Sequence, residues 1–189
     1  MASFDLYLPQ LLRFEGGFVD DPADPGGATN LGITLATFQR CAEPLLQEPP
    51  TLQDLRALTV QQAGAIYKQE YWDRLYGDQI ASQTLAEILF DFYVNAGDEA
   101  VVLLQRILLQ LGATGLATDG AMGPATLAAL EAADDAQVYA LYRQGRIAYY
   151  QRLAQERPVD QKFLTGWLER AEWFPADLPP TDAPPTATA

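Results

Sequence analysis

The chain has 189 residues, of which 49% are hydrophobic and 20% charged, which is enough for one full hydrophobic core or two small ones. The formal net charge of -13 at pH 7 argues against nucleic-acid binding, because that binding depends on Lys and Arg neutralising phosphates. The sequence has no histidine and one cysteine, Cys41, which excludes an intrachain disulfide, a histidine-dependent triad and a histidine zinc site. We therefore expect chemistry that uses carboxylates, with no metal and no cofactor.

The apolar segments of the sequence bear on where the protein is found. The N-terminus has no basic segment leading into an apolar stretch, and no run approaches the length of about 18 apolar residues that a membrane span needs. We expect a monomer that is made in the cytoplasm without a signal peptide and does not insert stably into a membrane.

The first predicted helix covers residues 4–15 and ends on an acid. Its apolar positions follow the spacing of one helix face, and Glu15 continues that stripe toward the core. Gly16 and Gly17 stop the helix, so Glu15 lies at the negative end of the helix dipole. This position and partial burial both favour a protonated carboxylic acid. Such an acid can protonate a leaving oxygen, as cleavage of a glycosidic bond requires.

The loop that follows Glu15 is rich in aspartate, proline and glycine. These turn-forming residues predict an irregular excursion or a short hairpin that returns at 28–31. Asp24 is the candidate second acid, with Asp20 and Asp21 as alternatives. The loop can hold several oxygens near one point.

The spacing of these groups resembles the motif of phage-type lysozymes. That motif has Glu, then eight residues, Asp or Cys, then five residues, Thr, and a Gly-Ile pair two positions on. Glu15, Asp24 and the Gly-Ile pair at 32–33 match it. Asn30 stands where the motif has Thr, and Thr29 is one place early.

A more extensive resemblance rests on four segments: FEGGF at 14–18, DPADPGGATNLGIT at 21–34, YWD at 71–73 and FDFYVNAG at 90–97. Together they resemble glycoside hydrolase family 108, the N-acetylmuramidases. The resemblance implies a lysozyme-like helical catalytic half, in which Glu15 corresponds to the family's glutamate, followed by a peptidoglycan-binding half.

The resemblance also implies roles and a partner, the glycan strands of peptidoglycan. Glu15 would be the general acid that cleaves the bond between N-acetylmuramic acid and N-acetylglucosamine. Asp24 would stabilise the cationic transition state or, with Asn30 or Thr29, orient an attacking water. Two other interpretations stay open. One is a noncatalytic wall-binding or phage structural protein, and the other is a lytic transglycosylase.

Candidate substrate contacts come from the middle of the chain. Trp72 either lines a sugar cleft, because aromatic faces stack on pyranose rings, or packs in the core. Residues 84–95 are apolar on most sides, which predicts a central buried helix. Asp91 and Asn95 interrupt that surface, so each needs a buried partner or a cleft to face. With Tyr93, they are the candidate contacts on this helix.

The second half of the sequence predicts further helices. Asp98 is placed to cap an amphipathic helix ending before Gly112, and Asp160 to open the last helix. The segment DGAMGPAT at 119–126 resembles a turn of peptidoglycan-binding modules. A basic series either forms a solvated face or contacts muramyl carboxylates; its members are Arg143, Arg146, Arg152 and Arg157.

We therefore predict a mainly α, lysozyme-like fold with a small hairpin or irregular loop after Glu15. Residues 1–97 would form the catalytic region, 98–174 a helical peptidoglycan-binding region, and 175–189 a disordered Pro-rich tail. The predicted function is peptidoglycan hydrolysis, serving bacterial lysis as a phage endolysin does. An injected effector and a bacterial autolysin stay open as alternatives.

Overall fold

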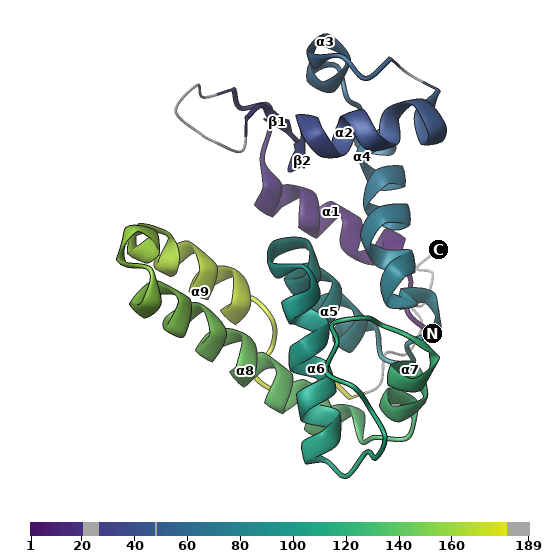
Figure 1. The fold of residues 1–189 in the computed structure, drawn as a ribbon, viewed down its shortest axis with the longest axis vertical. Helices are drawn as coiled ribbons and strands as arrows, with labels where there is room; N and C mark the ends of the chain where they lie inside the picture. The colour runs from purple at the N-terminus through teal and green to yellow at the C-terminus, as the bar shows by residue number, and fades with distance from the viewer. Residues whose placement is uncertain (21–26, 48, 181–189) are drawn as a thin grey trace, which may run out of the picture. The chain divides into compact units, whose positions relative to one another are not determined.

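The computed structural model describes residues 1–20, 27–47 and 49–180, so Asp21, Asp24 and the end of the Pro-rich tail lie outside the described residues. The described chain is mainly helical with a two-stranded antiparallel sheet, which confirms the predicted fold class (Figure 1). It forms two compact units. One is Phe4–Arg74, and the other comprises Met1–Ser3 with the chain from Leu75 onward.

The first unit begins with the predicted helix and hairpin. Its elements are α1 (Phe4–Glu15), β1 (Thr29–Asn30), β2 (Ile33–Thr34), α2 (Leu35–Cys41), α3 (Leu52–Arg56) and α4 (Val60–Tyr67), with π-helical turns at Ala42–Leu46 and Lys68–Trp72. Helix α1 buries Phe4, Tyr7 and Leu11, which recur on one helix face. The helix therefore lies with this face in the core and its last residue, Glu15, at the border of the core.

Side-chain caps fix where the helices of this unit begin. The hydroxyl of Thr34 accepts a hydrogen bond from the backbone N–H of Thr37, at 3.2 Å, and caps the start of α2. Thr59 and Gln62 form a reciprocal capping box at the start of α4, where the Thr59 hydroxyl accepts from the Gln62 N–H. These contacts span three residues, so a local sequence pattern is enough to predict them.

The second unit is built on long helices. After short 3₁₀ turns at Asp73–Leu75 and Gly77–Gln79, its elements are α5 (Gln83–Ala96), α6 (Asp98–Gln110), α7 (Pro124–Glu131), α8 (Asp135–Glu156), a 3₁₀ turn at Pro158–Phe163 and α9 (Leu164–Glu172). Helix α8 packs against α5, α6 and α9. Helix α5 is buried along most of its length, as its apolar surface predicts.

Two helix starts in this unit differ from the prediction. Asp98 is the first residue of α6 rather than its cap, because Gly97 occupies the cap position with a φ of 59° that glycine adopts readily. Asp160 lies inside a 3₁₀ turn, and α9 begins only at Leu164. Both predictions placed an acidic cap where the backbone conformation of neighbouring residues sets the start.

The DGAMGPAT segment is held closed by the buried side chain of Gln105 on α6. Its amide oxygen accepts from the N–H of Gly120 at 3.0 Å, and its amide nitrogen donates to Asp119 Oδ1 at 2.8 Å and to the Ala121 carbonyl at 3.1 Å. Gly120 has a φ of 76°, and a Cβ there would lie 2.8 Å from Cβ of Asp98. Asp119, Gly120 and Ala121 of the motif therefore hold this loop against α6.

Candidate active site

Glu15 is the last residue of α1 and is half-buried. Gly16 follows with a φ of 72°, a left-handed conformation that ends the helix as the Gly-Gly sequence predicts. The helix therefore delivers one carboxylate to the border of the core, and the chain then leaves toward the aspartate-rich loop.

The wall opposite the Glu15 carboxylate is the turn between β1 and β2. Leu31 and Gly32 form this two-residue turn with φ angles of 50° and 75°, the paired positive values of a tight hairpin turn. A Cβ on residue 32 would lie 2.5 Å from Oε2 of Glu15 and closer still to the Tyr67 hydroxyl. Only glycine fits at this position, because real Cβ atoms do not approach other atoms so closely.

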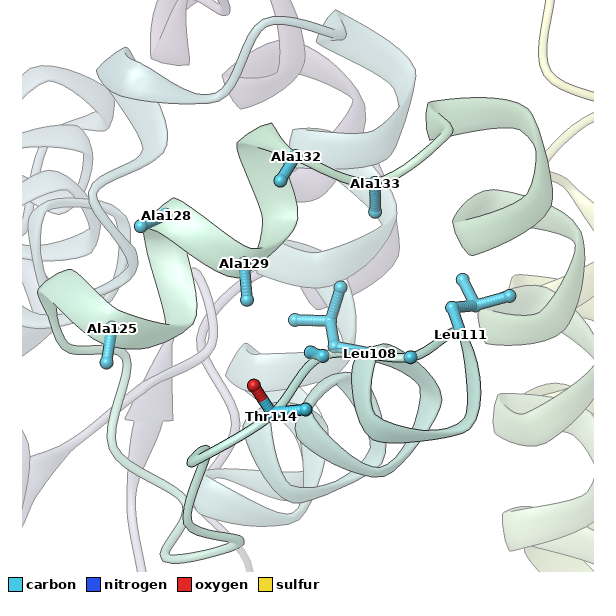
Figure 2. Close-up of a pocket in the computed structure, with 10 residues that line it drawn as sticks. Leu108, Leu111, Thr114, Ala125, Ala128, Ala129, Ala132 and Ala133 are labelled. Carbon is cyan, nitrogen blue, oxygen red and sulfur yellow. The ribbon is translucent and has the colours of Figure 1, made fainter.

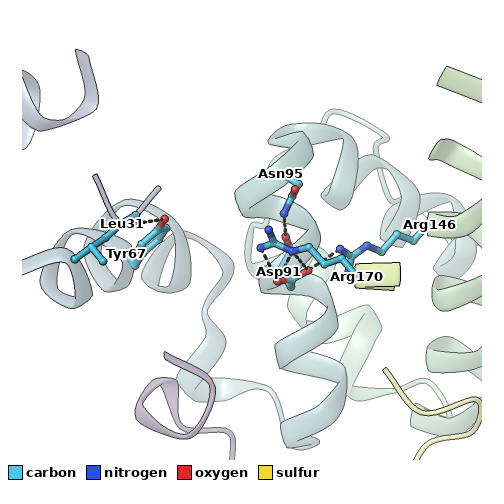
Figure 3. Close-up of polar contacts among 6 residues, drawn as sticks. All are labelled: Leu31, Tyr67, Asp91, Asn95, Arg146 and Arg170. Atoms are coloured by element: carbon cyan, nitrogen blue, oxygen red, sulfur yellow. Dashed lines mark hydrogen bonds and ion pairs between the residues drawn. The ribbon is translucent and has the colours of Figure 1, made fainter. Parts of the chain in front are cut away.

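Tyr67, the last residue of α4, holds the same turn in place. Its side chain is buried, and its hydroxyl donates a hydrogen bond of 3.0 Å to the carbonyl of Leu31 (Figure 3). Leu31 lacks the freedom of glycine at positive φ, so a contact that fixes its carbonyl helps to keep the turn closed. Glu15, Gly32 and Tyr67 thus meet at one point of the first unit.

The hairpin candidates Thr29 and Asn30 lie in β1. Thr29 is half-buried and pairs with Val19 through two backbone hydrogen bonds of 2.8 Å. Asn30 is buried, and its side-chain amide donates to the carbonyls of Leu55 at 2.9 Å and Arg56 at 3.1 Å. These bonds tie the hairpin to α3. Of the three candidate second acids, Asp20 is exposed, and the other two, Asp21 and Asp24, lie outside the described residues.

The sequence left open whether Asp91 on α5 has a buried partner or faces a cleft, and the structure shows a buried partner. Its Oδ2 lies 2.6 Å from Nη2 of Arg146, and Nη2 of Arg170 lies 2.8 Å from its Oδ1 (Figure 3). The side chains of Asp91 and Arg146 are fully buried. Burial lowers the pKa of Arg146, but the charge of Asp91, the hydrogen bond to it and the neighbouring Tyr150 together outweigh burial and raise that pKa, so the pair is ionic.

The other candidate contacts have different surroundings. Asn95 is exposed near the end of α5, and its amide donates to the backbone carbonyl of Asp91 at 2.9 Å. Tyr93 is half-buried on the same helix. Trp72 is fully buried, with its ring edge-on to Phe4 at a centroid distance of 5.8 Å, which fits the core alternative. Arg146 is also buried, so it does not belong to the predicted basic face.

A cavity of about 450 Å³ lies beside α7 in the second unit (Figure 2). It is lined by Leu108 and Leu111, by Thr114, and by small residues such as Ala125 and Ala129. No ionisable side chain lines it, so this cavity offers no group for acid–base catalysis. Within the described part of the chain, no cluster of three or more His, Cys, Asp or Glu could hold a metal ion.

Comparison with known proteins identifies both halves of the chain. Residues 8–97 match the family model of glycosyl hydrolase 108, and residues 99–172 match a predicted peptidoglycan domain. The structure of Brucella abortus SagA is 30% identical in sequence, has a TM-score of 0.72, and is covered over 90% of each chain. The chain belongs to the glycosyl hydrolase 108 family. No curated protein matches the sequence.

As a glycosyl hydrolase 108 protein with a peptidoglycan domain, the chain is a peptidoglycan hydrolase. Among its described residues, no helix combines the length and apolar character that crossing a membrane requires. The two family models meet at residues 97 and 99, whereas the compact units divide between Arg74 and Leu75. Helix α5 is therefore matched by the hydrolase model but packs within the second unit.

Sequence reasoning missed Tyr67 and Arg170, and it named Arg146 only as a member of a basic series. A signal for Arg146 was present, because it recurs at helical spacing with Tyr142 and Tyr150 and so belongs to the buried face of α8. Tyr67 had no comparable signal. Its partner Leu31 is 36 positions away, and nothing local indicates which carbonyl its hydroxyl reaches.

Proposed function

We propose that this glycosyl hydrolase 108 protein is an N-acetylmuramidase that cleaves the β-1,4 bond between N-acetylmuramic acid and N-acetylglucosamine, with Glu15 as the general acid. The observation that carries the proposal is the packing of the Glu15 carboxylate against Gly32 at the hairpin turn. Backbone atoms form that wall, so the carboxylate is fixed in direction while remaining half-exposed to a substrate.

The reaction requires a proton at the leaving glycosidic oxygen and charge or a nucleophile at the sugar carbon. Glu15 supplies the proton as the bond breaks. Asp24 is the proposed second acid, which stabilises the cationic transition state or activates water. If Asp24 activates water, its carboxyl group should lie about 6.5 to 9.5 Å from that of Glu15, and the anomeric configuration of the product should be inverted. A separation of about 5 Å with retained configuration would instead indicate that Asp24 is a nucleophile.

For the two hairpin residues we propose separate roles. The Asn30 amide makes two bonds to carbonyls at the end of α3, which supports a role in anchoring the hairpin. The Thr29 hydroxyl takes no part in the Asn30 bonds that anchor the hairpin to α3. Thr29 is therefore a better candidate than Asn30 to orient water beside Asp24. Asn95, exposed at the end of α5, is the proposed contact to a sugar acetamido or hydroxyl group.

The test replaces Glu15 by glutamine, which is nearly isosteric but cannot donate the proton. Removing a general acid costs a factor of about 10² to 10⁴ in rate, so Glu15→Gln should lose release of reducing ends from purified peptidoglycan. Glu43→Gln, an exposed glutamate in the same unit, is the matched control and should keep the parental rate. Both variants should keep the parental melting temperature.

Three outcomes contradict parts of this proposal. Equal rates for Glu15→Gln and the parent would exclude Glu15 as the acid. Products that carry an anhydro sugar in place of a reducing end would identify a lytic transglycosylase. A parent that releases no sugar ends from any wall preparation would be a noncatalytic wall-binding protein.

We further propose that hydrolysis serves bacterial lysis, as in a phage endolysin. The support is that one chain combines a hydrolase segment with a peptidoglycan segment. Cells that produce the protein in the cytoplasm should lose turbidity only after the inner membrane is permeabilised, and cells producing Glu15→Gln should not. Turbidity that never falls after permeabilisation would rule out the lytic role.

A further inference from the structure

Five aromatic rings of the second unit form a continuous row. The row runs from the exposed 3₁₀ turn before α9, across α9 and α8, to the buried face of α5. Neighbouring centroids are 5.8 Å apart for Phe163 and Trp167, 5.4 Å for Trp167 and Tyr150, 5.5 Å for Tyr150 and Tyr149, and 5.1 Å for Tyr149 and Phe92. We call these five residues the aromatic row.

The aromatic row is buried at its base and open at the other end. Phe92 and Tyr150 belong to the core, Tyr149 and Trp167 are half-buried, and Phe163 is 48% exposed. The buried rings fix the half-exposed ones, because each ring packs against the next, in edge-to-face, tilted or stacked arrangements. The exposed rings are therefore already immobilised before a ligand binds. Binding a flat apolar surface costs them little additional side-chain entropy.

Cations lie over two rings of the aromatic row, Phe163 and Tyr149. Nζ of Lys162 is 4.8 Å from the centroid of the Phe163 ring, and Cζ of Arg152 is 5.8 Å from that of Tyr149. The Arg152 side chain is 57% exposed and has Glu156 at 3.8 Å as a weak ion-pair partner. Both cations are long and flexible, so they can move from the ring face to its rim and remain available to an anion.

From this geometry we propose that the exposed part of the aromatic row binds a peptidoglycan strand, with sugar rings stacked on Phe163 and Trp167 and peptide carboxylates paired with Lys162 and Arg152. The inference rests on the proposed function and names the binding surface within the peptidoglycan domain at 99–172. The C–H faces of pyranose rings are flat and apolar, and peptide stems carry carboxylates, so this polymer matches both features of the surface.

The charge of the protein favours this occupant over a second copy of the chain. With a net charge of -13, most of the surface repels a carboxylate-bearing polymer, whereas this face offers two cations beside apolar rings. A symmetric dimer through the same face would place equivalent cations near each other and repel.

Binding is tested separately from hydrolysis, in the full chain carrying Glu15→Gln, by pelleting with insoluble purified peptidoglycan. Adding Phe163→Ala should raise the dissociation constant roughly fivefold or more, as expected for loss of an anchoring aromatic ring. Adding Lys162→Gln with Arg152→Gln should raise it roughly twofold to fivefold at low salt and have less effect at high salt, because the pairs lie at the rim.

Two control variants match these changes elsewhere on the second unit. Trp173→Ala removes an aromatic side chain that is 46% exposed and outside the aromatic row, and Arg106→Gln removes an exposed cation on α6. Both controls should bind like the Glu15→Gln parent. The charge variants involve exposed side chains, so they test the proposal even if Phe163→Ala lowers the melting temperature.

Equal binding of the row variants and their controls overturns the inference. So does sedimentation showing that the row mediates self-association while its variants still bind walls as the parent does. A parent that releases no reducing ends, but whose row variants lose wall binding, would refute the proposed hydrolysis and leave this binding surface standing. The reverse result would refute the surface and leave the proposed hydrolysis standing.

Discussion

At the scale of single residues, the position of the Glu15 carboxylate depends on the lack of a Cβ at Gly32. Gly32 leaves room for the Glu15 carboxylate because it has no Cβ, and its φ of 75° suits a hairpin turn. The Tyr67 hydroxyl also lies beside Gly32 and donates a hydrogen bond to the carbonyl of Leu31. A change at any of these positions alters the surroundings of Glu15 without removing the acid.

We predict that Tyr67→Phe lowers kcat by more than it changes KM. The variant loses the bond to Leu31, so the turn opposite Glu15 becomes less fixed, while the sugar-binding surface is unchanged. Loss of one hydrogen bond should also cost about 0.5 to 1.5 kcal/mol of unfolding free energy. Steady-state kinetics on solubilised glycan strands and denaturant unfolding measure both effects.

Tyr139→Phe provides a matched control for this prediction. Its hydroxyl also donates to a backbone carbonyl 36 positions away, that of Pro175, at 2.7 Å, but in the second unit. The control should lose similar stability and keep the parental kcat. If both variants have the same kcat, the hydroxyl of Tyr67 has only a structural role.

At the scale of elements, α5, α8 and α9 are joined by one buried carboxylate. Asp91 receives Arg146 from α8 and a two-pronged contact from Arg170 on α9, whose Nε lies 3.0 Å from Oδ2 and whose Nη2 lies 2.8 Å from Oδ1. The hydroxyl of Tyr142 adds a bond of 2.9 Å from α8 to the carbonyl of Ala100 on α6. Polar contacts therefore fix how these helices are placed, in addition to the apolar core.

We predict that Asp91→Asn destabilises the protein by about 3 to 5 kcal/mol, because it leaves two buried or half-buried arginines without their counter-charge. Glu156→Gln removes one partner of the exposed pair with Arg152 and should change stability by less than about 1 kcal/mol. Chemical denaturation of the two variants measures the difference. Equal, small losses would show that solvent reaches the Asp91 cluster.

At the scale of the whole molecule, the compact units do not coincide with the two family models. Helix α5 ends the hydrolase match at residue 97 but packs against α6 and α8. The predicted domain boundary between residues 97 and 98 stays a proposal. The packing instead leads us to expect that α5 unfolds together with the second unit.

We predict that the backbone amides of α5 exchange with solvent at rates close to those of α6 and α8, and unlike those of α1 and α4. Amides in one cooperative unit share one opening free energy, and α5 shares its buried contacts with the second unit. Native-state hydrogen exchange of the full chain measures this. Amides of α5 that follow α1 and α4 in denaturant would contradict it.

The net charge of -13 predicts an unusual dependence on salt. Bacterial walls are commonly anionic, and repulsion acts over about 30 Å at 0.01 M salt but about 8 Å at 0.15 M. The initial rate of wall clearing should therefore rise as salt is added over this range. With cell walls from which the anionic polymers have been removed, the clearing rate should rise less with salt. A clearing rate that falls with salt would instead indicate attraction between the protein and the wall.

The sequence by itself determined the helices that depend on local contacts, the hairpin after Glu15 and membership of the family. Caps at Thr34 and Thr59 link positions only three apart, and the glycines after Glu15 act on the adjoining residue. Such contacts can be identified from spacing alone.

Only the tertiary structure decided which partners the buried polar groups have. Tyr67 reaches Leu31 across 36 positions, and Asp91 reaches Arg146 across 55 and Arg170 across 79. Asn30, a candidate for water binding, proved to bond the carbonyls that end α3. A buried polar group must be paired, so the sequence shows that a partner exists, but which one depends on helices that meet only after the chain has folded.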